Sequence, residues 1–237
     1  MREWIFISLL LFSQFAHANK CEFTEQSFSQ WMMEYFRAPE PSKLNCSLSY
    51  YANSQLFQEH RDSRMPAAHF FAYALDENGL AEIFETLASE SSLNERMFLL
   101  HVFWVKNTGQ SKAFLEKATS VWPEAVIAEM VPKMLPAKTG NLLHEQPRSA
   151  GALDNLWAVF FATGKAEAVR QISSVLLLKD GSGMEILIGG AASWSLTANT
   201  RQYPEVRVIV EQLLEEAQGN QKAALEDVLA NASGKNT

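Results

Sequence analysis

Three stretches of this chain share one pattern, and that pattern restricts the fold more than any other feature. Each has an apolar run at helical spacing, a short polar segment, a glycine, and then a small and a large apolar residue at fixed positions. Glycine enters the left-handed backbone region without steric cost, so we expect each glycine to end a helix. The pattern predicts three helix–turn–helix units. They are FFAYALDENGLAEIF, LLHVFWVKNTGQSKAF and LWAVFFATGKAEAV, with Gly79, Gly109 and Gly164 at the turns.

The spacing of these units suggests an architecture. Gly79 and Gly109 are 30 residues apart, and Gly164 follows 55 residues later. Over residues 66–217 the chain resembles tetratricopeptide-like and related helical-repeat proteins, although the full tetratricopeptide signature is absent and the period is irregular. The resemblance implies stacked antiparallel hairpins with a concave face for a peptide or partner helix. The segments LDNLWAVFFATG and AASWSLTANTRQYPEVR also resemble parts of secreted bacterial proteins that carry no assigned activity, so they transfer no site.

We therefore predict an all-α fold, an irregular array of stacked antiparallel helical hairpins. Ser92 and Glu95 form a capping-box pattern that opens a helix reaching about Lys106. Residues 184–196 are apolar on nearly every side, which predicts a central, buried helix. The preceding SSVLLLKDGSGMEILI, residues 173–188, fits either helices or a β-hairpin around Asp180 and Gly181, and its leucine content favours helices.

The N-terminus is typical of a secretory signal peptide. An apolar core covers residues 5–12 after Arg2, and Ala16 and Ala18 provide the small residues of a cleavage site. We predict a signal peptide at 1–18 and export to the periplasm or the extracellular space. We expect an N-terminal helical pair with a disulfide at 19–65, the hairpin domain at 66–217, and a C-terminal helix with a disordered tail at 218–237. No later segment is apolar enough for a membrane anchor.

The cysteine and charge content limit the cell compartment and the class of partner that we expect for this chain. Cys21 and Cys46 are the only cysteines, and an isolated pair in an oxidising compartment predicts one disulfide, with two buried free thiols as the alternative. The formal net charge is −7, and no lysine–arginine cluster occurs. We expect no binding to nucleic acid, because such partners select basic surfaces.

Catalytic motifs are missing from the sequence. His60, His69, His101 and His144 have no ligand spacing, and neither a HExxH pattern nor a GxSxG nucleophile elbow nor a phosphate-binding glycine motif occurs. We interpret His101, inside MFLLHVFW, as a hydrogen-bonded core residue. We assign no catalytic residue and predict neither cofactor nor metal, and activity as an enzyme stays open.

One aromatic stripe and one polar group remain as candidates for function. Apolar residues at helical spacing between 153 and 161, with Trp157 at their centre, favour a core-facing stripe over a ligand groove. Asn155, Asn199, Arg201 and Tyr203 are candidates for a binding rim. We predict a protein–protein interaction module or scaffold with an unidentified protein or peptide partner. The alternatives are a periplasmic hydrolase or small-ligand binder with a dispersed site, or a secreted effector.

Overall fold

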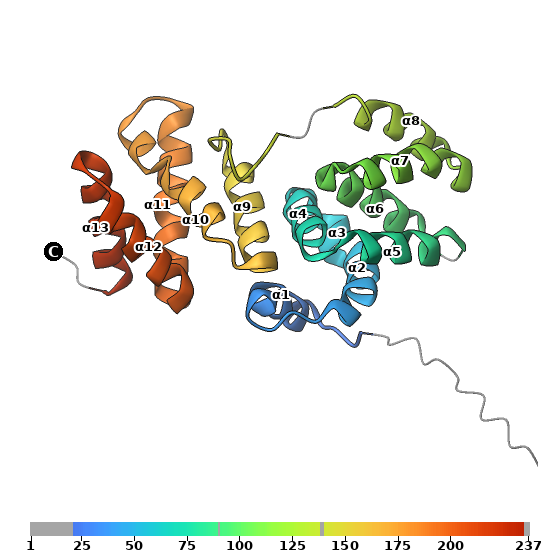
Figure 1. The fold of residues 1–237 in the computed structure, drawn as a ribbon, viewed down its shortest axis with the longest axis horizontal. Helices are drawn as coiled ribbons and strands as arrows, with labels where there is room; N and C mark the ends of the chain where they lie inside the picture. The colour runs from blue at the N-terminus through green and yellow to red at the C-terminus, as the bar shows by residue number, and fades with distance from the viewer. Residues whose placement is uncertain (1–20, 90, 138–139, 235–237) are drawn as a thin grey trace, which may run out of the picture.

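The computed structural model describes residues 21–89, 91–137 and 140–234, and these residues fold into α-helices and short 3-10 turns without a strand. The all-α prediction is confirmed. The predicted signal peptide at 1–18 and the last residues of the predicted tail lie outside the described residues. The α-helices, shown in Figure 1, are α1 (Glu25–Glu34), α2 (Leu44–Asn53), α3 (Gln55–Glu59), α4 (Arg64–Ala74), α5 (Glu77–Ser89), α6 (Leu93–Lys106), α7 (Gly109–Val121), α8 (Ala125–Met134), α9 (Ala150–Thr163), α10 (Ala166–Ser173), α11 (Met184–Gln202), α12 (Pro204–Glu216) and α13 (Gly219–Ala232).

Two groups of helices meet along α4 and α9. Helices α2–α8 form one group and α9–α13 form the other, with α1 beneath both (Figure 1). Alanines allow α4 and α9 to pack closely, because Ala68 and Ala72 on α4 and Ala158 and Ala162 on α9 are all buried. A small side chain at each contact lets two helix backbones approach each other. This contact fixes the position of every residue that lines the seam between the groups.

The hydrophobic interior consists of two clusters that share α9. Ala158 and Ala162 belong to the first cluster, which otherwise draws its buried residues from the segment between Phe28 and Val131. Leu153, Leu156, Trp157 and Phe160 belong to the second cluster, which extends to Val228. These four side chains are buried, so the prediction of a core-facing stripe in α9 is confirmed.

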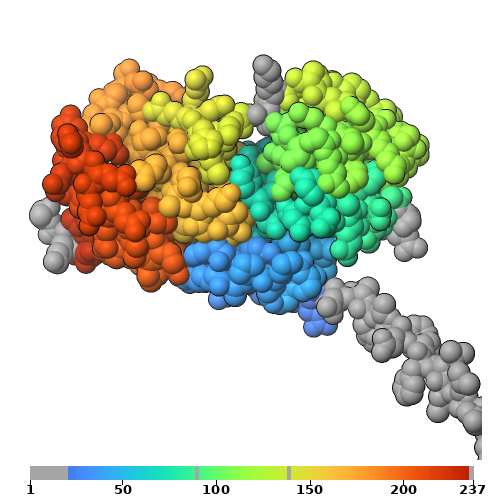
Figure 2. Space-filling model, in the orientation of Figure 1, coloured from blue at the N-terminus to red at the C-terminus, as the bar shows by residue number. Residues whose placement is uncertain are grey.

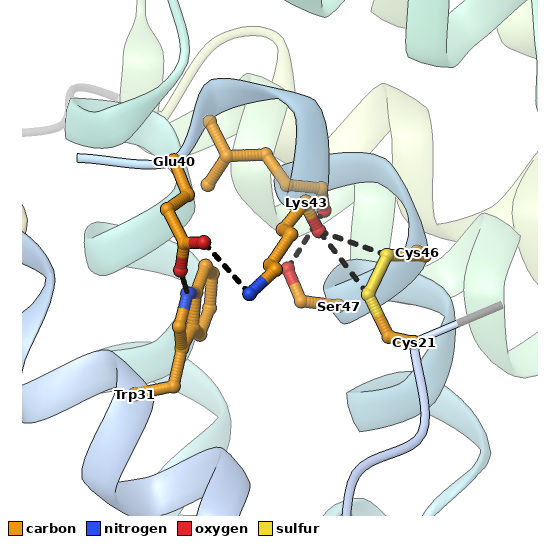
Figure 3. The surroundings of a disulfide bond; sticks show 7 residues. Cys21, Trp31, Glu40, Lys43, Cys46 and Ser47 are labelled. Atoms are coloured by element: carbon orange, nitrogen blue, oxygen red, sulfur yellow. Dashed lines mark hydrogen bonds and ion pairs between the residues drawn. A yellow bond between two sulfur atoms is a disulfide. The ribbon is translucent and has the colours of Figure 1, made fainter. Parts of the chain in front are cut away.

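The N-terminal segment is attached to both groups. Cys21 is bonded to Cys46 on α2, as predicted, with a Cα–Cα distance of 5.5 Å (Figure 3). Beside this bond, the Glu40 carboxylate accepts a hydrogen bond from Trp31 Nε1 at 3.0 Å. At the other end of the segment, the Arg37 guanidinium donates two hydrogen bonds to Glu205 on α12, at 2.8 and 2.7 Å. Figure 2 shows this segment in blue, running under both groups.

The predicted helix ends are correct at one glycine and wrong at two. Gly164 ends α9 in the left-handed region, with φ of 68°. Gly79 instead lies inside α5, where the Asp76 side chain accepts a hydrogen bond from its amide at 2.7 Å. Gly109 is the first residue of α7, and Asn107, with φ of 50°, takes the left-handed position after α6. Asparagine tolerates this conformation better than most residues, so it replaces glycine there.

Two other sequence-based predictions have clear outcomes. The predicted capping box at Ser92 and Glu95 is confirmed, and α6 ends at Lys106. Residues 173–188 are not a β-hairpin: the 3-10 helix η4 covers Leu176–Asp180, and α11 starts at Met184. None of the helices in the described residues is long and apolar enough to cross a membrane.

The prediction that residues 184–196 form a buried helix is wrong on one side. Helix α11 packs on η4 and on α13 through Ile188, Ala192 and Leu196. Gly189 makes this packing close, since a Cβ there would lie 2.0 Å from the Lys179 amide nitrogen. No described element covers the opposite side, where 76% of the Trp194 surface is exposed. Helix α11 is therefore apolar on every side because it has a second, exposed apolar surface, and not because it is completely buried.

Candidate ligand cavity at the seam

A cavity of about 410 Å³ lies at the seam between the two groups of helices. Its walls come from α4, α6, the start of α9 and the segment 140–148 that precedes α9. We call it the seam cavity. It is lined by Met65, His69, Trp104, Val105, Gly140, Leu142, Glu145, Gln146, Pro147, Arg148, Ala152 and Asn155. Its volume is within the range of sites for small ligands and short peptide segments.

Two residues that line the seam cavity each have a buried side-chain atom without a hydrogen-bond partner in the described structure, as do five side-chain atoms elsewhere. The two atoms in the lining are the indole nitrogen of Trp104, which only donates, and Oδ1 of Asn155, which accepts. Leaving a buried donor or acceptor unpaired costs about 1–3 kcal/mol. Most buried polar groups in folded proteins have a partner, so an unpaired one calls for an explanation such as a functional role or a bound water or ion.

His69 contributes a further acceptor to the same cavity. Its Nδ1–H donates to the Met65 carbonyl at 2.8 Å, an i to i−4 contact that α4 provides. Burial lowers the pKa of His69, so the imidazole is neutral near neutral pH. With Nδ1 protonated, the neutral ring has an acceptor at Nε2. The seam cavity thus combines one donor and two acceptors in a partly buried setting.

The segment 140–148 provides the exposed residues of the cavity lining. Gln171 on α10 donates to the Leu143 carbonyl at 3.0 Å, and the Glu145 carboxylate accepts from the Asn141 amide at 3.1 Å. These bonds fix the backbone of the segment. Glu145, Gln146 and Arg148 are exposed at the rim, and Arg148 has no ion pair in the described residues. A peptide or polar ligand therefore meets charged groups of both signs on entry.

The lining of the seam cavity is part apolar and part polar. Met65, Val105 and Leu142 form the apolar part of the wall. In a typical ligand site, a few polar groups in such a wall fix the orientation of the ligand. Among the described residues that line the cavity there is no serine, threonine or cysteine. No group of three or more histidine, cysteine or acidic side chains in the described part of the chain is placed to hold a metal ion.

The four residues predicted as a binding rim do not lie together. Asn155 lines the seam cavity, but Asn199, Arg201 and Tyr203 have partners inside the chain. Asn199 donates to the Ser195 carbonyl at 2.9 Å. Arg201 donates to the Asn231 carbonyl at 2.8 Å and to that of Ala232 at 3.3 Å, and so binds the C-terminal end of α13.

Tyr203 is part of the aromatic interior. Its ring lies 5.2 Å from the ring of Phe161 and beneath the Arg37 guanidinium, which is 5.3 Å from its centroid. It is 1% exposed and serves packing between α9, α12 and the N-terminal segment. The contribution of these residues is structural in every contact that the structure shows.

Of the residues that line the seam cavity, His69 was considered from the sequence only as a possible metal ligand, and Trp104 and Arg148 were not proposed for any site. His69 and Trp104 lie inside apolar helical runs, where most such residues are core. Arg148 lies in an irregular segment without a motif. The only signal in the sequence was indirect, namely polar residues at positions of α4 and α9 that face away from the apolar stripes. His101 was predicted to be a hydrogen-bonded core residue: its Nδ1–H donates to the Met97 carbonyl at 2.8 Å, but the residue is partly rather than fully buried.

A smaller apolar cavity, of about 240 Å³, lies between α1, α4 and α9. Met32, Met33, Phe70, Trp157 and Phe161 line it, together with Asp154, whose pKa is raised by burial and by the charge of Asp62. The Trp157 indole nitrogen is buried there without a partner in the described structure. This cavity adjoins the shared core, and its walls are the residues that hold α1 on α9.

Comparison with family models, with curated proteins and with solved structures finds no match for this chain.

Proposed function

We propose that this chain is an exported binding protein whose seam cavity holds a short peptide segment of a protein partner. The observation that carries the proposal is the pair of buried, unpaired atoms, Trp104 Nε1 and Asn155 Oδ1. Each peptide unit offers one N–H donor and one C=O acceptor. In this proposal a bound segment supplies a carbonyl to Trp104 and an amide to Asn155, and the side chains that cover these atoms move, because each atom has less than 1 Å² of accessible surface.

Charge and size support a peptide as the ligand. The exposed Arg148 favours an acidic or C-terminal carboxylate at the rim, and the apolar wall of Met65, Val105 and Leu142 accommodates one side chain. A cavity of about 410 Å³ holds a few residues rather than a whole helix. The partner of this proposal is therefore an extended segment.

Export is part of the proposal, and two features support it. The Cys21–Cys46 bond is stable in an oxidising compartment, and the N-terminal sequence has the pattern of a cleavable signal. The runner-up function is binding of a small polar metabolite in the same cavity, which the same unpaired groups favour.

A peptide-display screen followed by calorimetry tests the proposal. We expect the wild type to select peptides from a random library, and Asn155→Leu to weaken their binding about 10-fold or more. Asn199→Leu is the matched control, because the same substitution there removes only the local bond to Ser195. Peptides that bind Asn155→Leu as tightly as the wild type contradict the site. A screen that selects no peptide contradicts the proposed ligand.

Stability separates a binding role of Asn155 from a structural one. Replacing Asn155, whose Oδ1 is buried and unpaired, by leucine is expected to raise the free energy of unfolding by about 1 kcal/mol. Urea unfolding of the ligand-free protein measures it. A loss of more than about 1 kcal/mol shows that the amide serves the fold instead.

A further inference from the structure

Helix α11 presents an exposed apolar surface that the seam cavity does not use. Trp194 is 76% exposed, Met184 65%, Leu187 63% and Ile186 47%. We call this surface, together with Gly190 between them, the α11 face. In a monomeric protein large apolar side chains are exposed singly, whereas several on one helix mark an interaction site.

The α11 face has no charge over most of its length. No ionisable residue occurs between Glu185 and Arg201. At 100° per residue, Leu187, Gly190, Trp194 and Arg201 lie on one side of the helix, opposite the packed Ile188, Ala192 and Leu196. A solvated helix face normally has charged or strongly polar residues at such positions. The composition is that of a helix face that packs on another helix.

The shape of the face is self-complementary. Trp194 projects from it, and Gly190, one turn earlier, leaves an open space, since a Cβ there would meet nothing within 4 Å. A two-fold axis through the level of residue 192 places Trp194 of one copy over Gly190 of the other, and Leu187 opposite Thr197. Each copy then supplies the projection and the space, as an isologous interface requires.

We propose that the α11 face is the interface of a homodimer, in which two copies of α11 pack antiparallel. The charge distribution favours this direction. Arg201, near the C-terminal end of α11, is the one charged residue on this side of the helix, and its guanidinium binds the Asn231 and Ala232 carbonyls of α13. A parallel pair sets the two Arg201 side chains beside each other, whereas an antiparallel pair separates them to opposite ends and aligns the helix dipoles favourably.

The exposed area is sufficient for a specific but dissociable dimer. The four large side chains expose on the order of 500 Å² of apolar surface, to which Trp194 alone contributes roughly 190 Å². Stable interfaces bury about 800 Å² on each partner. The neighbouring small and polar residues of α11 add part of the difference. The area predicts a dimer that forms and dissociates with protein concentration.

Light scattering coupled to size exclusion, over about a 100-fold range of concentration, tests the dimer. We expect the mass to rise from one chain to two, and Trp194→Lys and Leu187→Lys to remain monomeric while keeping the wild-type helical circular dichroism. Leu93→Lys is the matched control, because Leu93 is 42% exposed at the start of α6, in the other group of helices. This variant should still dimerise. A wild type that stays monomeric, or a Trp194→Lys variant that still dimerises, overturns the proposal.

Cysteine cross-linking tests the antiparallel direction. A mixture of Leu187→Cys and Thr197→Cys should oxidise to a mixed covalent dimer, because the two positions face each other across the axis. Leu187→Cys alone should not, since two copies of that position lie roughly 15 Å apart in an antiparallel pair. The native cysteines are bonded to each other and do not interfere. A covalent dimer of Leu187→Cys alone overturns the antiparallel arrangement.

Discussion

Replacing Trp157 by alanine tests the central packing of the molecule. Trp157 is 6% exposed, and its ring lies 6.0 Å from that of Phe160 and 6.1 Å from that of Phe161. Removal of the indole takes roughly 160–230 Å² of apolar surface out of the core, which costs about 4–6 kcal/mol at 25 cal/mol per Å². Removal of the unpaired indole N–H returns about 1–3 kcal/mol.

The net expectation is a loss of about 3 kcal/mol in the free energy of unfolding of Trp157→Ala. Urea or guanidinium titration, followed by far-UV circular dichroism, measures it. Trp157→Phe keeps most of the ring and removes the unpaired N–H, so we expect a change within about 1 kcal/mol. The two substitutions separate the packing contribution from the polar one at the same position.

Trp194→Ala is the matched control for this series. The same substitution at a side chain that is 76% exposed should change stability by less than about 0.5 kcal/mol, at protein concentrations where the chain is monomeric. The reasoning is refuted if Trp157→Ala costs less than about 1 kcal/mol, or if Trp194→Ala costs as much as Trp157→Ala.

Three further predictions concern the disulfide, the N-terminus and pH. Replacing both Cys21 and Cys46 by alanine should lower the free energy of unfolding by about 2–4 kcal/mol, because the bond closes a loop with a sequence separation of 25. Thiol labelling of the denatured, unreduced wild type should find no free cysteine. Intact-mass measurement of protein from the exported fraction should give Asn19 as the first residue, and retention of residues 1–18 contradicts the cleavage site. Burial lowers the pKa of both His69 and His101, so the unfolded chain binds protons more readily than the folded one. The contribution of these two histidines to the free energy of unfolding should therefore be complete above about pH 6.5 and fall as the pH decreases below it. In the double variant His69→Gln, His101→Gln, the urea midpoint should change less between about pH 8 and 5.5 than in the wild type. An equally steep profile in this variant assigns the loss of stability to other groups.

Residue patterns predicted the fold class and several helix boundaries because these depend on local chemistry. Ser92 and Glu95 specify a helix start through bonds within four residues. Gly79 and Gly109 failed as helix ends because helix starts at Asp76 and Thr108 determine those turns. A glycine in sequence does not show whether it follows one helix or begins the next.

Burial and the site were less accessible from the sequence, for a physical reason. Trp157 and Trp194 lie in similar apolar runs, yet one is in the shared core and the other is in solvent. The difference depends on which element packs against each helix, which is long-range information. The seam cavity has the same origin: His69, Trp104 and Asn155 come from three helices, and no local spacing relates them.

The sharing of α9 between the two cores determines how the chain reaches its folded state. The first eight helices bury part of their interior against Ala158 and Ala162, which become available only once α9 has been added. The last four helices likewise lack their central apolar partner without Leu156 and Phe160. Loss of α9 exposes buried surface of both clusters at once, so we expect their unfolding to be coupled.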